Sequence, residues 1–213
     1  MLIFVYPSPR TMLKKTLPFF SYIFHPVFIP IYATLFYLFP EDSYVINKEK
    51  SLVLLEVAVI TFVIPILFFF LLKSTGRISS IMAHELSERK FPLVIQSFLL
   101  ILLVKKSITV ERYPELHFFI LGALTSTLIA LILLFANKKA SLHMIGISAL
   151  TFFVFGLSMH HQTTSTLTTI FLVITNGLVA SSRLIMNAHT PKELTMGVLA
   201  GSIPQILLMY LWL

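Results

Sequence analysis

The stretch LHFFILGALTSTLIALILLFA, residues Leu116–Ala136, decides the fold class. It runs for 21 residues without an Asp, Glu, Lys or Arg. A helix of about 20 apolar residues reaches across the hydrocarbon core of a bilayer. The stretch therefore predicts a transmembrane helix, and the rest of the chain has the composition to match it.

The composition of the whole chain excludes several classes of protein. Of its 213 residues, 57% are hydrophobic and 12% are charged, whereas a soluble domain has about 25% charged residues. With 20 Phe and so little charge, the chain is not disordered. Because it has no Cys, it is neither a disulfide scaffold nor a thiolate zinc protein. The length fits one domain, so we expect a single integral membrane domain over residues 1–213.

Apolar blocks elsewhere in the chain extend this prediction to about seven spans. The expected fold class is all-α, a polytopic membrane helical bundle, with two N-terminal spans in residues 1–72 and a core in residues 73–213. The predicted spans are Leu17–Phe39, Ser51–Leu72, Phe91–Val104, Leu116–Ala136, Ser141–Met159, Thr166–Ser181 and Pro191–Leu213. Pro26 and Pro30 lie inside the first span, where neighbouring helices can satisfy the freed backbone carbonyls.

The net charge of +7 is distributed unevenly over the two membrane faces that seven spans define. Face A, the side of the N-terminus, carries 11 of the 16 Lys and Arg residues: Arg10, Lys14, Lys15, Lys73, Arg77, Arg89, Lys90, Lys138, Lys139, Arg183 and Lys192. Bases in short loops between apolar blocks indicate lipid headgroups as partners, and not nucleic acid. The positive-inside rule predicts that face A is cytoplasmic, unless its bases bind phosphate. Residues Met1–Pro9 do not have the pattern of a secretory signal.

The segment Ser182-Arg183-Leu-Ile-Met-Asn-Ala-His189-Thr190-Pro191-Lys192-Glu193 contains the most informative polar pattern. Thr190, Pro191 and Glu193 are typical of the N-cap, first and third positions of a helix. A carboxylate beside His189 can hold one imidazole nitrogen as a donor and leave the other free to attack. Arg183 offers a planar fork that suits phosphate. Glu193 also fits a simple capping box.

The joint spacing of this segment resembles the third signature of the type 2 phosphatidic acid phosphatase superfamily, Ser-Arg-x5-His-x3-Asp. Ser182, Arg183 and His189 match it, and Glu193 stands where the family has Asp. Gly197 and Gly201 follow at the spacing that many members share; they also form a small-xxx-small face, which is typical of close helix packing.

Two further segments correspond to the other family signatures. Ala140-Ser141-Leu142-His143 matches two of the four positions of Pro-Ser-Gly-His, and Ser141 is suited to cap the helix that follows. In Lys-x6-Arg-Pro, Arg89 matches the arginine, while Met82 and Lys90 replace the lysine and the proline. The resemblance covers about residues 73–205.

The resemblance implies a metal-independent lipid phosphatase without a cofactor. His189 would be the nucleophile and form a phosphohistidine, His143 would protonate the leaving oxygen, and Glu193 would orient His189. Phosphate would be bound by Arg183, Ser141, Arg89, Lys90 and Lys139. The substrate would be a membrane lipid phosphate or diphosphate. Related bacterial enzymes sit in the inner membrane with an external active face, which opposes the positive-inside prediction.

Other readings of the sequence remain open. The chain can be a degenerate family member that binds anionic headgroups or assists a membrane complex, and a small transporter is a third possibility. Glu56 lies within a span and can pair with His25. His160 and His161 are adjacent, which is a poor arrangement for a metal site. Gln96 and Asn176 are expected to form hydrogen bonds between helices.

Overall fold

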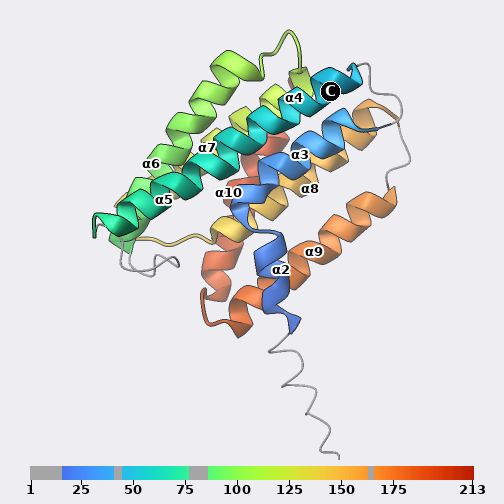
Figure 1. Cartoon of the computed structure of the whole chain (residues 1–213). Helices are drawn as coiled ribbons and strands as arrows, with labels where there is room; N and C mark the ends of the chain where they lie inside the picture. The colour runs from blue at the N-terminus through green and yellow to red at the C-terminus, as the bar shows by residue number, and fades with distance from the viewer. Residues whose placement is uncertain (1–15, 41–44, 77–85, 163–165) are drawn as a thin grey trace, which may run out of the picture.

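A computed structural model describes residues 16–40, 45–76, 86–162 and 166–213, and this part of the chain is helical, with no strand. The long helices run side by side in one bundle (Figure 1). In chain order the elements are α2 (Pro18–Ile23), η1 (Pro26–Phe28), α3 (Ile29–Leu38), α4 (Asn47–Ala58), the π-helix η2 (Val59–Val63), α5 (Ile64–Ser74), α6 (Leu86–Leu102), the π-helix η3 (Leu103–Ser107), α7 (Pro114–Phe135), α8 (Leu142–His160), α9 (Thr166–Ile185) and α10 (Pro191–Met209). The fold class predicted from the sequence is confirmed as an all-helical bundle.

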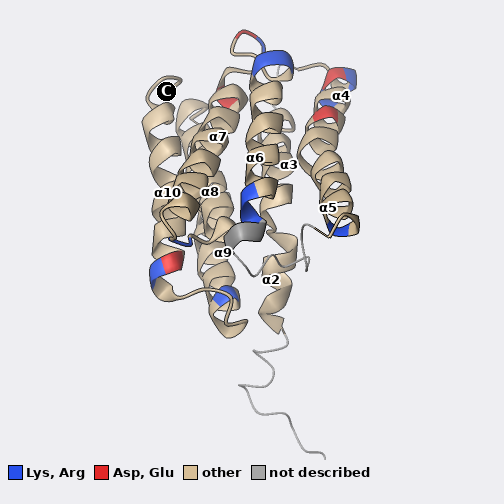
Figure 2. Cartoon of the chain, turned by 90° about the vertical axis from the view of Figure 1, so that its left-hand side faces the viewer, with Lys and Arg blue, Asp and Glu red and all other residues tan. Residues whose placement is uncertain are grey.

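Four helical segments are long and apolar enough to cross a membrane. They are Asn47–Ser74, Pro114–Phe135, Leu142–His160 and Thr166–Ile185, with 28, 22, 19 and 20 residues. Large apolar side chains cover their outer surfaces, for example Phe68, Phe70 and Ile132. Charged residues lie near the ends of individual helices, and long stretches between those ends carry no charge (Figure 2). This distribution suits a protein embedded in a bilayer; the count of seven spans stays a prediction.

The first predicted span, Leu17–Phe39, is not one continuous helix. It divides at Phe24 and His25 into α2 on one side and η1 with α3 on the other. Pro26 explains the break, because it lacks an N–H and disfavours the helical conformation in the residue before it. His25 accordingly adopts an extended backbone, with φ −65° and ψ 139°. α2 then packs beside α9 (Figure 1).

Helix α10 packs against α8 and α7 and holds these helices together in the core of the bundle. Gly197 of α10 lies against the backbone of Ser141, and Gly201 lies against the carbonyl of Ile145. The glycines thus allow the close helix packing that their spacing predicts. Deeper in the bundle, the rings of Phe119 and Phe153 contact each other at a tilt of 39°, with centroids 4.6 Å apart.

Candidate functional site

The candidate site lies at one end of the bundle, where α6, α8 and α10 begin and α9 ends (Figure 2). The segments around Arg89, His143 and His189, which the sequence analysis places on face A, come together there. Electrostatic interactions connect their side chains, including His143 with His189 and Arg89 with Glu193. Met82, which stands at the lysine position of the first signature, lies outside the described residues.

His189 and Glu193 form the pair that the sequence predicts. The Nδ1–H of His189 donates to Glu193 Oε2 over 2.8 Å, which leaves Nε2 as the nitrogen with a free lone pair. The same carboxylate oxygen accepts the Thr190 N–H over 3.3 Å, and the Thr190 hydroxyl accepts the Glu193 N–H. Glu193 therefore closes the predicted capping box and orients His189 at the same time.

The ring of His189 is buried among positive charges. Only 8% of the residue is exposed. Burial lowers the pKa of His189 to about 4, helped by the charges of Lys139, Arg183 and Arg89 and opposed by the hydrogen bond to Glu193. His189 is therefore neutral at physiological pH, and a neutral imidazole is the nucleophilic form.

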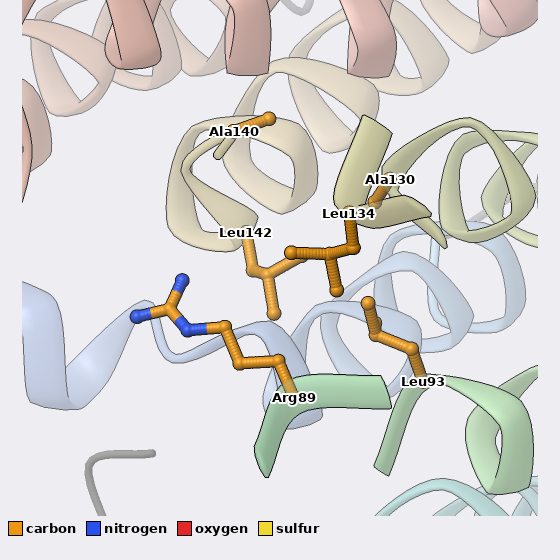
Figure 3. A pocket seen from close by; sticks show the side chains of 6 residues that line it. All are labelled: Arg89, Leu93, Ala130, Leu134, Ala140 and Leu142. Atoms are coloured by element: carbon orange, nitrogen blue, oxygen red, sulfur yellow. The ribbon is translucent and has the colours of Figure 1, made fainter. Parts of the chain in front are cut away.

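Arg183 and Arg89 bring guanidinium groups to this end of the bundle. Arg183 Nη1 lies 3.8 Å from Met186 Sδ. Its Nε is buried and has no hydrogen-bond partner in the part of the chain that the structure describes. Arg89 borders a small pocket with Leu93, Leu134 and Leu142, and its guanidinium points away from Leu93 and Leu134 (Figure 3). Both side chains interact electrostatically with His189.

Lys139 and Lys90 have different surroundings, although the sequence suggests phosphate contacts for both. Lys139 Nζ donates to the Ala188 carbonyl over 3.1 Å. Burial lowers its pKa, and the neighbouring Arg89 and Arg183 lower it further, against the opposing effect of Glu193. Lys90 Nζ instead lies over the Phe135 ring, 5.1 Å from its centroid. Lys139 is thus part of the cationic cluster, whereas Lys90 is held by an aromatic face of α7.

Ser141 and His143 open α8 beside α10. Ser141 is fully buried, and its hydroxyl accepts the Met144 N–H over 3.5 Å as the predicted N-cap. Its own N–H donates to the Glu193 carbonyl over 3.1 Å. His143 Nε2 lies 3.1 Å from the Ser21 carbonyl oxygen. The structure therefore gives Ser141 a capping role and places His143 against α2.

Two residues that the sequence analysis did not assign to the site lie next to His143. The ring of His25 contacts the ring of His143 edge to face, with centroids 5.0 Å apart. The Ser21 hydroxyl lies 2.6 Å from the Ser182 hydroxyl, beside Arg183. These contacts join residues that are more than a hundred positions apart, so no motif spacing in the sequence indicates them. The only sequence signal for this region was the proline that follows His25, which indicates a helix break.

Beside the His189–Glu193 pair lies an open basic cleft of about 280 Å³. It is lined by Asn137, Lys138, Lys139, Thr190, Lys192, Glu193 and Met196. Among the described residues no ion pair involves these three lysines. The cleft thus has an excess of positive charge, and it shares Lys139 and Glu193 with the cationic cluster.

The remaining polar predictions have mixed outcomes. Asn176 Nδ2 of α9 donates to Thr151 Oγ1 of α8 over 2.7 Å, as expected. Glu56 is not paired with His25; its carboxylate accepts a hydrogen bond from the Ser107 hydroxyl.

One acidic residue lies beside the adjacent pair His160-His161 in the fold: Glu115 Oε1 is 3.4 Å from His160 Nε2. No group of three or more potential metal ligands occurs within the described residues.

Comparisons with protein families, with curated proteins and with solved structures find no match to this chain.

Proposed function

We propose that the chain hydrolyses the phosphate monoester or diphosphate of a membrane lipid, without a metal, through a phosphohistidine. One observation carries the proposal. A neutral, buried imidazole with a free Nε2 is held by a carboxylate among Arg89, Arg183 and Lys139. Glu193 interacts electrostatically with Arg89 and Lys139, and a bound phosphate would form charge-assisted hydrogen bonds with the guanidinium groups of the cluster.

In the proposed reaction, His189 Nε2 attacks phosphorus while the bond to the leaving oxygen of the lipid breaks and His143 protonates that oxygen. The guanidinium groups of Arg183 and Arg89 stabilise the charge on the non-bridging oxygens. Glu193 stabilises the positive charge that develops on His189. Water then cleaves the phosphorus–nitrogen bond and releases phosphate. The position at the end of an apolar bundle fits a substrate whose tail remains in the bilayer.

The decisive experiment measures phosphate release from mixed lipid phosphates by the purified chain in detergent. The wild type should release phosphate and His189→Ala should not. Lys90→Ala is the matched control, because Lys90 lies over Phe135 and should contribute little. Equal rates for wild type and His189→Ala would eliminate the proposal.

The basic cleft favours a second candidate function, the binding of anionic lipid headgroups without turnover. Three lysines around an open volume offer point charges for such a headgroup. Flotation with anionic and with neutral vesicles tests it. Binding to anionic vesicles that Lys138→Gln and Lys192→Gln weaken, together with no phosphate release by the wild type, would favour this candidate.

We further propose that the protein lies in a bacterial inner membrane with the site on the external face. Labelling of that face tests this proposal.

A further inference from the structure

The break between α2 and η1 leaves backbone carbonyls without their usual helical partners. Pro26 has no N–H, so the Tyr22 carbonyl loses the donor four residues on. His25 is extended, so its N–H does not continue the helix to the Ser21 carbonyl. The Ile23 carbonyl accepts the Tyr32 hydroxyl over 3.0 Å instead. Freed carbonyls of this kind need other donors.

The Ser21 carbonyl finds its donor in His143. A carbonyl oxygen only accepts, so the His143 Nε2 that lies 3.1 Å from it must carry the proton. The neutral ring then has a lone pair on Nδ1. His189 has the opposite tautomer, since its Nδ1 donates to Glu193 and its Nε2 is bare. The two imidazoles of the site therefore carry their protons on different ring nitrogens.

The same segment also fixes the plane of the His143 ring. His25 contacts it edge to face at an interplanar angle of 88°, and His25 itself is held because its Nδ1 accepts the Val27 N–H over 3.4 Å. The hydroxyl pair of Ser21 and Ser182 attaches α2 to the residue that precedes Arg183. With its tautomer and its plane both set by α2 and η1, His143 is pre-organised.

We propose that the segment Ser21–Pro26 is a positioning element of the site, which makes Nδ1 of His143 the atom that exchanges a proton with a bound phosphate. This inference rests on the proposed function. A phosphate monoanion that binds the cationic cluster gives its proton to Nδ1. That proton passes to the leaving oxygen as the phosphorus–oxygen bond breaks, and Nδ1 later accepts a proton from the attacking water. Nε2 keeps its proton on the Ser21 carbonyl throughout.

Nitrogen-15 NMR of the histidine rings tests the inference on the purified full chain in detergent, with His143→Gln to assign the signals. The wild type should show His143 with Nε2 protonated and Nδ1 bare. Inorganic phosphate should shift the Nδ1 signal and leave Nε2 protonated. A protonated Nδ1 in the phosphate-free protein, or an Nδ1 signal that phosphate does not move, would overturn the inference.

Pro26→Ala tests the cause of this tautomer. The variant restores an N–H and permits a helical His25, whose N–H then competes for the Ser21 carbonyl, so the His143 signals should become a mixture of tautomers. Pro18→Ala is the matched control, because Pro18 is the first residue of α2, where a restored N–H has no carbonyl in the helix to compete for, and the signals should stay unchanged. A wild-type pattern in Pro26→Ala would show that the break does not set the tautomer.

Turnover supplies a separate readout. Phosphate release by Pro26→Ala should fall on the order of ten-fold in kcat with little change in KM, because general acid catalysis is lost while binding is kept. A wild type without any phosphatase activity would refute the proposed function and leave the NMR result intact, so the two failures are distinguishable.

Discussion

Replacing Gly197 with Ala should separate the two helices on which the site is built. A methyl group there would lie 2.7 Å from the Ser141 carbonyl oxygen and 2.9 Å from Met144 Cβ. Ordinary contact starts at 3.4 Å, and a backbone carbonyl cannot rotate away, so α10 must move from α8 by about 0.7 Å. Overpacking of this kind costs about 1–3 kcal/mol.

The same movement should affect the chemistry. The bond from the Ser141 N–H to the Glu193 carbonyl is 3.1 Å long and lies one turn before Gly197 in α10. Lengthened by a similar amount, it reaches about 3.8 Å, which is too long for a hydrogen bond. We therefore expect Gly197→Ala to lower both the midpoint of unfolding and the rate of phosphate release.

Thermal unfolding in detergent, followed by circular dichroism, measures the stability of this variant. Gly177→Ala is the matched control, because nothing lies within 4 Å of the added methyl group in α9. Alanine there should stabilise the helix by about 0.5–1 kcal/mol. A Gly197→Ala protein that melts at or above the wild-type temperature would refute the argument for close packing.

Three further predictions concern charge and topology. Glu193→Asp should keep substantial turnover and Glu193→Gln should lose most of it, because the charge on the partner of His189 matters more than its length; a Gln variant at full rate would contradict this. Because the pKa of His189 in the folded protein, about 4, lies below its usual value of 6.5, its contribution to the free energy of unfolding is present above pH 6.5 and is lost as the pH falls toward 4. A His189→Gln variant should therefore show a flatter acid limb in a pH series of unfolding midpoints, and an identical limb would contradict the lowered pKa. Single cysteines at Ser87, Lys139 and Asn187, introduced into a chain that has none, should react with an impermeant thiol reagent from one side of the membrane, and opposite labelling of any two would show that the basic segments do not share a face.

Local patterns predicted local structure well. Thr190, Pro191 and Glu193 occupy the cap positions that their order indicates, and Ser141 caps α8, since capping depends on residues within one turn of the helix. The pairing of His189 with Glu193 follows from the same local pattern. The two residues are four positions apart at the start of α10, and side chains with this spacing lie on the same side of a helix.

Tertiary contacts explain what the sequence did not predict. Pro26 was compatible with a kinked but continuous span, and the sequence did not show that α2 breaks away from α3 and packs beside α9. The partner of His143 lies 122 residues away, and the partner of Glu56 lies 51 residues away. Lys90 carries the charge of a phosphate ligand, yet the Phe135 ring of α7 holds it elsewhere. None of these pairs has a spacing that a single sequence displays.

Positive charges lie close together in the cluster. Arg89, Arg183 and Lys139 repel one another, and Glu193 is already engaged by His189 and by the Thr190 N–H. Burial strengthens such repulsion, since the effective dielectric constant falls below that of water. A protein that only needed anchoring at the membrane surface would bind headgroups better with bases that extend into the headgroup region than with partly buried ones. The arrangement is therefore better explained by a ligand that brings negative charge to the site. Under the proposed function, the phosphate of a lipid would supply that charge.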